Sequence, residues 1–382
     1  MKRARIALMS GAALLGPITS TPCLGQFCDV ERLGSMPLDA RFELEIEGPT
    51  LFARSLDGVR IVDISDPNAP ALISTIDGLD GNDIEIVGTT MYVADFLGRL
   101  VIVDVSDPAT PVQLSEIATP GPEFLEIEGT TAVVASQFAS TVTLFDVSDR
   151  SQPAQVSQFR IGDRIESLEV RWPHAFLSNT DDLIILDISD PLNPRELGRY
   201  NSGLDGVSFI GLQDSLAFVR EARGADRLLQ LVNVGRPEAM RLFRTGIFDF
   251  REFAPPYEIQ GDWLISQARF SNMAIHSLED RAHPRLLGTF EVASGDNAIK
   301  LIGDRLYILG RSTLEIFDIG GCPPYDFCPA DLNADGVANF YDTQEFVNLY
   351  LAGKLQADFD GDGTLTPADL IAFQTSLAAG CP

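Results

Sequence analysis

The chain has few basic residues and very few histidines. Its 382 residues include 28 Lys and Arg against 55 Asp and Glu, which gives a formal net charge of −27. Binding to nucleic-acid phosphates or to anionic lipid requires a basic face, so this balance argues against both kinds of partner. Only three histidines occur, and no two are spaced like the ligands of a zinc site. The commonest general base and metal ligand is therefore scarce.

Sequence motifs of several enzyme classes are also missing. The chain has no phosphate-binding glycine loop, no dinucleotide fingerprint and no serine-hydrolase elbow. Carboxylate pairs of the glycosidase type form only in space and leave no characteristic spacing, so this class stays open. A binding function is therefore favoured over an enzymatic one.

Long apolar stretches are scarce as well, and the one near the start is short. Lys2, Arg3 and Arg5 precede an apolar run over residues 6–15, and small and turn residues continue to Gly25. This order is typical of a secretory signal, which we assign to residues 1–25, with cleavage after Ser20 as the alternative. The run is too short to span a bilayer. We therefore expect no membrane span in the mature chain, and a secreted or cell-surface location.

Removal of this signal leaves four of the five cysteines. They are Cys28, Cys322, Cys328 and Cys381. An even number in an exported chain predicts two disulfides, for which three pairings are possible.

A short phrase recurs through the middle of the chain. Its first two copies read VRIVDISDP over residues 59–67 and LVIVDVSDP over residues 100–108. The marker positions of all copies are Asp63, Asp104, Asp146, Asp187, Asn233, Ser277 and Asp318. Neighbouring markers lie 41 to 46 residues apart, a period typical of propellers and solenoids.

Each repeat contains four short β-branched or alternating runs. In the second repeat they cover residues 84–87, 91–94, 100–104 and 112–117, separated by glycine, polar or Asp-Pro turns. Four strands repeated seven times predict an all-β fold, the seven-bladed β-propeller. Because the aspartate recurs in most repeats, we expect it to accept hydrogen bonds from turn amides rather than to catalyse.

The repeats resemble those of the LVIVD-repeat family, whose name residues 100–104 spell. The resemblance covers roughly residues 29–320 and implies an exported propeller. The fifth and sixth copies depart from it, because Asn233 and Ser277 replace the aspartate and Arg236 and Arg281 alter the turn.

The segment after the predicted signal supplies the strand that the seventh repeat lacks. Residues 32–36 (RLGSM) resemble the fourth runs at residues 196–200 and 287–290. We predict that this N-terminal strand closes the last blade, so that the propeller covers residues 26–321. Closure removes exposed sheet edges. It also brings Cys28 beside Cys322, and we expect a disulfide between them.

Two acidic loops near the end match the twelve-residue calcium loop. Residues 331–342 and 358–369 carry oxygen-bearing side chains at positions 1, 3, 5, 9 and 12, glycine at position 6 and a backbone carbonyl donor at position 7. The predicted ligands are Asp331, Asn333, Asp335, Val337, Asn339 and Asp342, then Asp358, Asp360, Asp362, Thr364, Thr366 and Asp369. Two calcium ions are expected; the alternative is a pair of acidic surface turns.

One helix is predicted after each loop, with Phe346 and Phe373 at matching positions. Cys322-Pro323-Pro324 excludes a helix before the first loop. Loop followed by helix, twice, resembles a dockerin-like module of the EF-hand type, and we assign residues 322–382 to this domain. The resemblance implies a Cys328–Cys381 disulfide and calcium-dependent docking to a protein.

In that family, loop positions 10 and 11 contact the partner. Here these positions hold Phe340, Tyr341, Pro367 and Ala368. They are not the small hydroxyl residues common at these positions, so a cohesin-like partner and a different secreted or cell-surface receptor both stay open.

The innermost predicted strands align a glutamate in five of the seven repeats. These residues are Glu45, Glu85, Glu126, Glu169 and Glu258, with Ser208 and Lys300 in the other two. Inner strands of a propeller line its channel, so the carboxylates predict a site for a cation or a basic peptide. The alternative is that channel water solvates them.

The sequence as a whole indicates an exported, non-catalytic binding or scaffold propeller with a calcium-dependent docking module. Its propeller ligand is expected to be a peptide or a glycan. One alternative is a polysaccharide-acting hydrolase or lyase that the tail recruits to its substrate. The other is a structural protein of the cell surface.

Overall fold

The computed structural model describes most of the predicted propeller and the two C-terminal helices. The described residues are 29–40, 43–201, 205–213, 215–223, 226–247, 254–268, 272–278, 285–293, 298–321, 330, 340–351, 357, 359 and 366–379. The predicted signal, all the cysteines and nine of the twelve predicted calcium ligands lie outside them.

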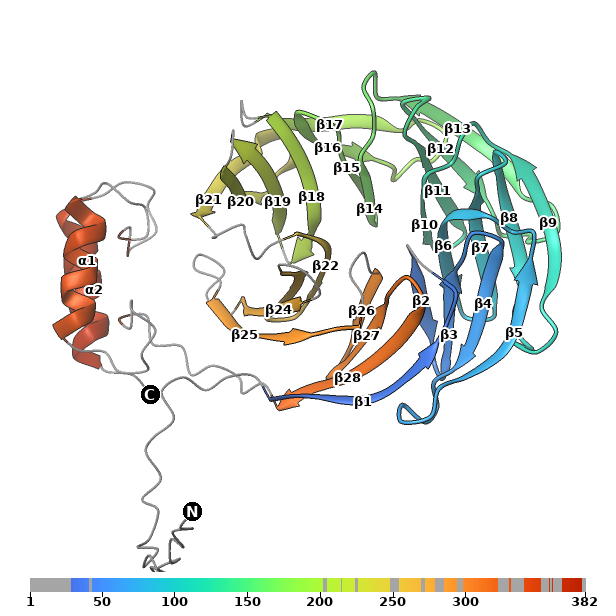
Figure 1. Ribbon diagram of the computed structural model, residues 1–382. Coiled ribbons are helices and arrows are strands. Elements are labelled where there is room, and N and C mark those ends of the chain that lie inside the picture. Colours follow the sequence, from blue (N-terminus) through green and yellow to red (C-terminus); the bar gives the residue numbers. More distant parts are fainter. Residues whose placement is uncertain are drawn as a thin grey trace, which may run out of the picture.

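The described strands form seven four-stranded antiparallel sheets arranged as a ring (Figure 1). The first three blades contain β2 (Leu44–Glu47), β3 (Thr50–Arg54), β4 (Gly58–Asp63) and β5 (Ala71–Asp77); β6 (Gly81–Val87), β7 (Thr90–Asp95), β8 (Arg99–Asp104) and β9 (Val112–Ala118); and β10 (Phe124–Glu128), β11 (Thr131–Ser136), β12 (Thr141–Asp146) and β13 (Ala154–Arg160).

The fourth and fifth blades follow the same order from the channel outward. They contain β14 (Ser167–Arg171), β15 (His174–Ser178), β16 (Asp182–Asp187) and β17 (Arg195–Asn201), then β18 (Asp205–Gln213), β19 (Leu216–Arg223), β20 (Asp226–Asn233) and β21 (Arg241–Ile247). A short 3-10 turn, η1 (Pro237–Ala239), lies between β20 and β21.

The last two blades complete the ring. The sixth contains β22 (Ala254–Gln260), β23 (Trp263–Gln267), β24 (Asn272–Ser277) and β25 (Arg285–Glu291); the seventh contains β26 (Ala298–Ile302), β27 (Arg305–Leu309), β28 (Thr313–Gly321) and β1 (Asp29–Pro37). The seven-bladed fold predicted from the repeat is therefore confirmed.

Ring closure by the N-terminal strand is confirmed as well. β1 pairs with β28, and the register places Gly34 opposite Ile316 and Asp29 opposite Gly321. Gly34 occupies the position that Gly198 holds in β17, opposite Ile185. The resemblance of the RLGSM segment to the other fourth strands thus reflects an equivalent place in the sheet.

The hydrophobic core lies between neighbouring blades, in seven separate clusters. One cluster joins Val62 and Leu51 of the first blade to Leu309 and Ile316 of the seventh. Each of the other six joins two consecutive blades in the same way. Because alternate residues of a strand point to opposite faces, a middle strand must be apolar on both sides. This explains continuous apolar runs such as residues 100–103.

The repeated aspartates stabilise the turns that follow the third strands, as predicted. The carboxylates of Asp63, Asp104 and Asp146 accept hydrogen bonds from the backbone N–H two residues later, at 2.8 to 2.9 Å. Asp187 and Asp318 do the same at 3.0 and 2.8 Å. The side-chain hydroxyl and then the backbone N–H of the serine two residues later lower the pKa of Asp63 and Asp146, and the pKa of Asp187 to about 2. For Asp104 the backbone bond is the larger cause of the lowered pKa.

Close contacts at the perimeter link several outer strands to the turn of the next blade. The hydroxyls of Ser74 and Ser157 donate to the carbonyls of Pro108 and Pro191, both at 2.5 Å. At the equivalent position Gly198 packs against the Pro237 carbonyl so closely that a Cβ would overlap it. Gly34 of the closing strand meets Pro67 in the same way. The seam of the ring is thus built like the other blade contacts.

Two helices follow, α1 (Phe340–Leu351) and α2 (Pro367–Ala379). They lie where the sequence predicts one helix after each acidic loop. Phe346 and Phe373 are buried and stack with ring centroids 4.4 Å apart. No helix among the described residues is long and apolar enough to cross a membrane.

Candidate functional site

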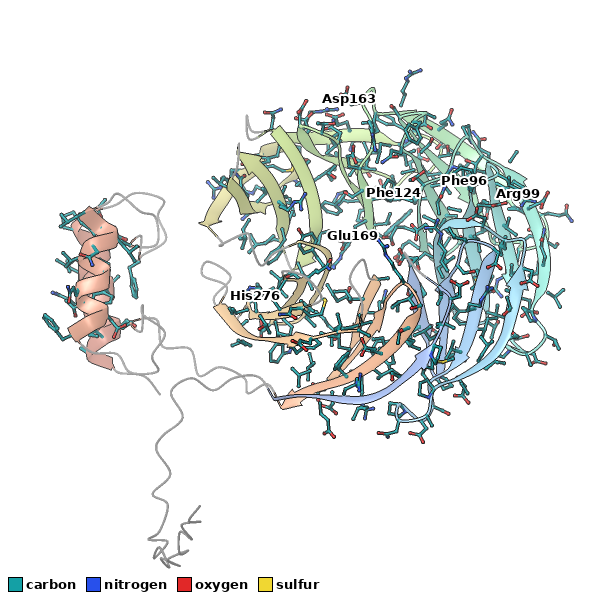
Figure 2. The ribbon with its side chains drawn as sticks, in the orientation of Figure 1. Phe96, Arg99, Phe124, Asp163, Glu169 and His276 are labelled. Atoms are coloured by element: carbon teal, nitrogen blue, oxygen red, sulfur yellow. The ribbon has the colours of Figure 1, made fainter. Side chains whose placement is uncertain are left out.

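The innermost strands of the seven blades surround a central channel. Each inner strand contacts the inner strand of the next blade, and β26 contacts β2. The five predicted glutamates occupy equivalent positions, opposite Phe52, Tyr92, Val133, Phe176 and Ile265 of the second strands. Figure 2 shows Glu169 near the centre of the ring, whereas Arg99 and Asp163 lie towards its perimeter. The structure therefore brings the predicted glutamates to one channel.

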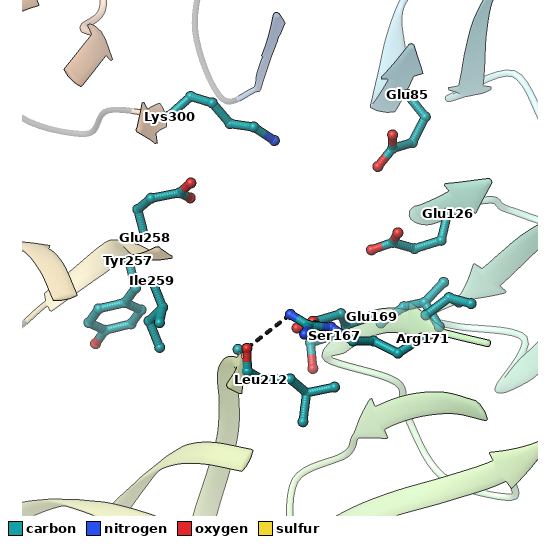
Figure 3. Close-up of a pocket in the computed structure, with 13 residues that line it drawn as sticks. Glu85, Glu126, Ser167, Glu169, Arg171, Leu212, Tyr257, Glu258, Ile259 and Lys300 are labelled. Carbon is teal, nitrogen blue, oxygen red and sulfur yellow. Dashed lines mark hydrogen bonds and ion pairs between the residues drawn. The ribbon is translucent and has the colours of Figure 1, made fainter. Parts of the chain in front are cut away.

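A cavity of about 530 Å³ occupies this channel. Its charged lining residues are Glu85, Glu126, Glu169, Arg171, Glu258 and Lys300. Figure 3 shows the carboxylates of Glu85, Glu126 and Glu258 and the ammonium group of Lys300 pointing into the open centre. Among the described residues, no group of three or more Asp, Glu, His or Cys lies close enough together to hold a metal ion.

The channel holds its carboxyl groups in an unfavourable place for negative charge. Burial, followed by repulsion from Glu126 and Glu45, raises the pKa of Glu85 to about 10. Burial and neighbouring carboxylates also raise the pKa of Glu126 well above its usual value. Burial raises the pKa of Glu258 to about 7, although Lys300 opposes that effect. Several channel carboxyls therefore carry protons near neutral pH.

Lys300 is the only predicted channel position with a positive charge. Its Nζ lies 2.7 Å from Glu45 Oε1, in a half-buried ion pair between the seventh and first blades. Burial opposes the charge on Lys300, but Glu45 and then Glu258 hold the pKa of this side chain above its usual value. The pair shows that a primary ammonium group can satisfy a channel glutamate.

Arg171 extends the lining on the side of the fourth blade. Its guanidinium donates to Glu169 at 2.9 Å and to the carbonyl of Leu212 in the fifth blade, also at 2.9 Å (Figure 3). The ion pair moderates the charge of Glu169, but burial still raises the pKa of that carboxyl.

A second group of acidic residues precedes the glutamates on the first two inner strands. Asp83 lies two residues before Glu85, on the same face of β6. Glu43 lies two residues before Glu45, just ahead of β2, where its carbonyl accepts a hydrogen bond from Arg54 N at 3.0 Å. Burial raises the pKa of Asp83 to about 7 and that of Glu43 well above its usual value. The Asp83 carboxylate accepts a hydrogen bond from Leu125 N at 2.7 Å. Glu43 was missed in the sequence, although its period-two spacing from Glu45 is visible there.

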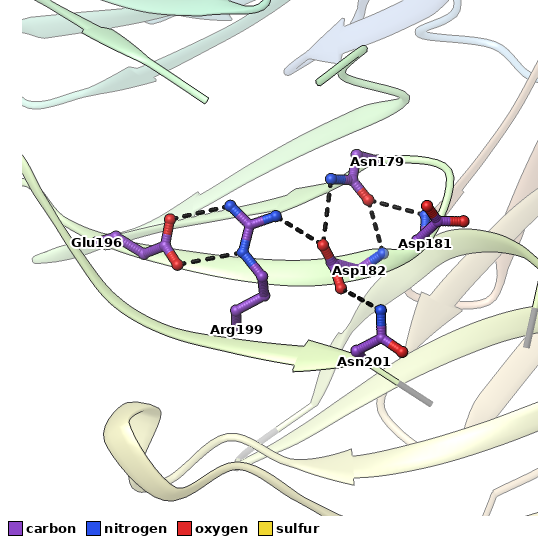
Figure 4. Close-up of polar contacts among 6 residues, drawn as sticks. All are labelled: Asn179, Asp181, Asp182, Glu196, Arg199 and Asn201. Carbon is purple, nitrogen blue, oxygen red and sulfur yellow. Dashed lines mark hydrogen bonds and ion pairs between the residues drawn. The ribbon is translucent and has the colours of Figure 1, made fainter. Parts of the chain in front are cut away.

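Not every polar cluster offers a site. At the turn between β15 and β16, Arg199 pairs with Asp182 at 2.6 Å and with Glu196 at 3.1 Å, and Asn201 donates to Asp182 at 2.7 Å (Figure 4). The amide oxygen of Asn179 accepts from two turn N–H groups. These groups satisfy one another, so the cluster stabilises a turn.

The C-terminal part of the described chain contains three of the predicted calcium ligands. Asp342 and Asp369, at position 12 of the two loops, are both fully buried. The Asp369 carboxylate accepts hydrogen bonds from Phe359 N at 2.6 Å and Thr366 N at 2.7 Å, which joins the start and the end of the second loop. The remaining predicted ligands and the Cys328–Cys381 pair lie outside the described residues.

The predicted partner residues lie at the starts of the two helices. Phe340 is 73% exposed, and Pro367 and Ala368 are also exposed. Tyr341 lies in the first turn of α1. Phe340, Pro367 and Ala368 are therefore accessible on the helical part taken by itself.

Comparisons with known proteins agree with this fold. The LVIVD repeat family matches residues 53–78, 80–119 and 174–202, so the chain carries LVIVD repeats. No curated protein matches the chain.

Solved structures show the same architecture at low sequence identity. The computationally designed Ika8 protein is 12% identical with a TM-score of 0.55, over 77% of this chain and 100% of that one. A protein from Lactobacillus plantarum is 15% identical with a TM-score of 0.55, over 64% and 83%. BamB from Moraxella catarrhalis is 10% identical with a TM-score of 0.51, over 76% and 99%. At these identities the likeness concerns the fold alone.

Proposed function

We propose that this chain is an exported, non-catalytic binding propeller whose C-terminal helices form a calcium-dependent docking module. The propeller fold with LVIVD repeats supports a binding or scaffold role. The observation that carries the docking module is its internal duplication: Asp342 and Asp369 are both buried, and Phe346 stacks on Phe373, each pair 27 residues apart. Two copies of one loop–helix unit therefore share one small core.

The residue types of both loops fit calcium, which prefers carboxylate, amide, hydroxyl and carbonyl oxygens. Bound there, the ion would neutralise the loop carboxylates and supply folding free energy to the module. Asp369, at position 12 of the second loop, already accepts hydrogen bonds from the backbone N–H groups of Phe359 and Thr366. Phe340, Pro367 and Ala368, exposed at the helix starts, would then meet a protein receptor, either cohesin-like or on the cell surface.

The test is calorimetric titration of Ca²⁺ into chelator-treated full-length protein, with circular dichroism in parallel. We expect two bound ions and a gain of helical signal. Asp358→Ala should leave one ion, whereas the channel variant Glu126→Gln should keep both. No uptake, or uptake that Asp331→Ala and Asp358→Ala leave unchanged, would refute the docking module.

We further propose that the propeller binds a basic peptide at its acidic channel. The Lys300–Glu45 ion pair is an internal example of this chemistry, and the cavity leaves Glu85, Glu126 and Glu258 directed at its centre (Figure 3). A lysine side chain that entered beside Glu85 would favour the ionised carboxylate. Because that carboxyl is protonated near neutral pH, binding would release a proton.

Proton release is the signature to measure. A trilysine peptide titrated at pH 7 in two buffers of different ionisation enthalpy should give different heats for wild type and nearly equal heats for the Glu85→Gln, Glu126→Gln double variant. The Glu196→Gln variant, altered at the satisfied cluster of Figure 4, should behave as wild type. Equal heats in both buffers for wild type would contradict a channel site.

A polysaccharide-acting enzyme recruited by the tail, and a structural cell-surface protein, remain the alternative functions. Release of reducing ends or unsaturated products from a glycan panel would establish the first, and fractionation with the cell envelope the second.

The predicted Cys28–Cys322 disulfide gains support from the pairing of the adjacent residues Asp29 and Gly321.

A further inference from the structure

The turn after the third strand changes its charge in the fifth blade. In the fourth blade, Asp187 accepts from Ser189 N at 3.0 Å and pairs with Arg195 at 2.9 Å, and Asp190 precedes Pro191. In the fifth blade the same positions hold Asn233, Arg241 and Arg236 before Pro237. The registers are equivalent, because Asp187 lies opposite Arg195 and Asn233 opposite Arg241. The three positions thus change from a net charge of −1 to +2.

The replacements turn acceptors into donors. The Asn233 side chain still supports the turn, since its Oδ1 accepts from Gly235 N at 3.0 Å. Its other polar atom is therefore the amide Nδ2, which can only donate, where Asp187 of the fourth blade offers a second carboxylate oxygen to Arg195. Arg241 consequently lacks the carboxylate that Arg195 has. Within the described part of the chain, neither Arg236 nor Arg241 has a side-chain hydrogen bond or ion pair.

These donors line a cavity of about 590 Å³. Its walls are formed by Ser215, Asn233, Gly235, Arg236, Ala239 and Arg241. Ser215 belongs to the turn before β19, and its carbonyl accepts from Val234 N at 2.8 Å, which fixes the two turns together. A Cβ on Gly235 would lie 3.1 Å from Ser215 Cβ, so the glycine keeps this space open where the fourth blade has Ser189. Glu238 is exposed nearby on η1 but is not part of the lining.

We propose that this cavity binds an oxyanion: a carboxylate, sulfate or phosphate group of a ligand. The two guanidinium groups and the amide N–H₂ can only donate hydrogen bonds, and the hydroxyl can donate one. An oxyanion offers only acceptors, so it matches this lining. Arginine forks bind such groups through two parallel hydrogen bonds. The ligand of this site is an anion, whereas the ligand proposed for the channel is a basic peptide. The proposal for this site is independent of the functions proposed for the channel and the tail.

The test compares this blade with its neighbour in the full-length protein. Sodium sulfate, sodium phosphate and sodium citrate are each titrated calorimetrically into wild type, with ionic strength held constant by sodium chloride. We expect saturable uptake of at least one anion at one site, and the arms of the titration identify which oxyanion group fits.

Three variants locate the site. Asn233→Asp restores the residue that most other blades carry, so it should fold normally and pair with Arg241; we expect at least tenfold weaker binding. Arg241→Ala should weaken binding by a similar factor, whereas Arg195→Ala in the fourth blade should leave it unchanged. Circular dichroism confirms that each variant is folded. Absence of saturable uptake by wild type, or equal affinity of wild type and folded Asn233→Asp, would overturn the proposal.

Discussion

The perimeter and the channel of the propeller join the same seven blades in opposite ways. At the perimeter, serine hydroxyls donate to carbonyls of the next blade, and at other blades a glycine lets the two backbones touch. In the channel, neighbouring blades present carboxyl groups to one another, and burial raises the pKa of Glu85, Glu126 and Glu258. The outer contacts hold the ring together, whereas the carboxyl groups of Glu85, Glu126 and Glu258 lie where burial disfavours their negative charge.

The difference bears on the peptide site that we propose for the channel. Acidic groups that repel one another gain nothing for the fold, so their presence in five of seven inner strands calls for another cause. If the channel binds the proposed peptide, fold stability and ligand binding are separated along the radius of the molecule. The following variants test that separation, beginning with the largest expected effect.

Gly198→Ala should weaken the perimeter most strongly. The new methyl group would overlap the Pro237 carbonyl, so two blades must move apart. We expect a loss of about 2 to 3 kcal/mol in the free energy of unfolding, measured in urea. Gly129→Ala, where a Cβ meets nothing within 4 Å but the φ is +59°, serves as the control for backbone strain alone and should cost less. Equal losses in both variants would contradict the role of the close contact.

Glu85→Gln should raise the free energy of unfolding, in contrast to Gly198→Ala, and the size of this effect should depend on pH. The carboxyl of Glu85 keeps its proton up to about pH 10 in the folded chain but only up to about 4.5 when unfolded. The folded state is therefore favoured fully below pH 4.5, and this contribution is lost as pH rises towards 10. At pH 8 we expect the glutamine variant to be more stable than wild type by about 1 kcal/mol or more, and at pH 4.5 to be about equally stable.

The control for this prediction is Glu45→Gln, which removes the partner of Lys300 and should lower stability at pH 8. Urea unfolding at both pH values separates the two behaviours. A stabilising effect of Glu45→Gln, or no pH dependence for Glu85→Gln, would mean that the channel does not disfavour charge.

Ser157→Ala should give the smallest change. It removes the hydroxyl that donates to Pro191 O at 2.5 Å, and the carbonyl stays partly accessible to water, so we expect a loss of about 1 kcal/mol. Ser151→Ala removes a hydroxyl bond of 2.6 Å within a single turn, where Asp149 still accepts from Ser151 N. It should cost less than the change that affects two blades. The reverse order, measured by thermal unfolding, would refute the perimeter contact.

Much of the fold is visible in the sequence because each blade repeats the same physical problem. Both faces of a middle strand are buried between blades, so the apolar run LVIVD recurs, and the turn after it needs an acceptor for a backbone N–H, so aspartate recurs. The closing strand was recognisable for the same reason: Gly34 performs the task of Gly198. Weaker repeats at Asn233 and Ser277 still kept the spacing, which made the blade count secure.

The site was less predictable, since its properties depend on neighbours distant in sequence. The spacing of the inner glutamates placed them on one channel, but the raised pKa of Glu85 depends on burial and on Glu126 and Glu45 from adjacent blades. The cavity at Arg236 and Arg241 was missed for a related reason. Asn233 and Arg236 are visible in the sequence as departures from the repeat, yet only the strand register shows that Asn233 stands where Arg241 would need a carboxylate partner.

The pairing of β1 with β28 has a consequence for the order in which the protein can form. A chain is synthesised from its N-terminus, so the strand made first must wait for the strand made last among the blades. Until Gly321 has emerged, β1 has no partner and both ends of the incomplete ring expose strand edges, which are prone to aggregate. If the chain is exported as we propose, it should therefore reach the far side of the membrane before it closes.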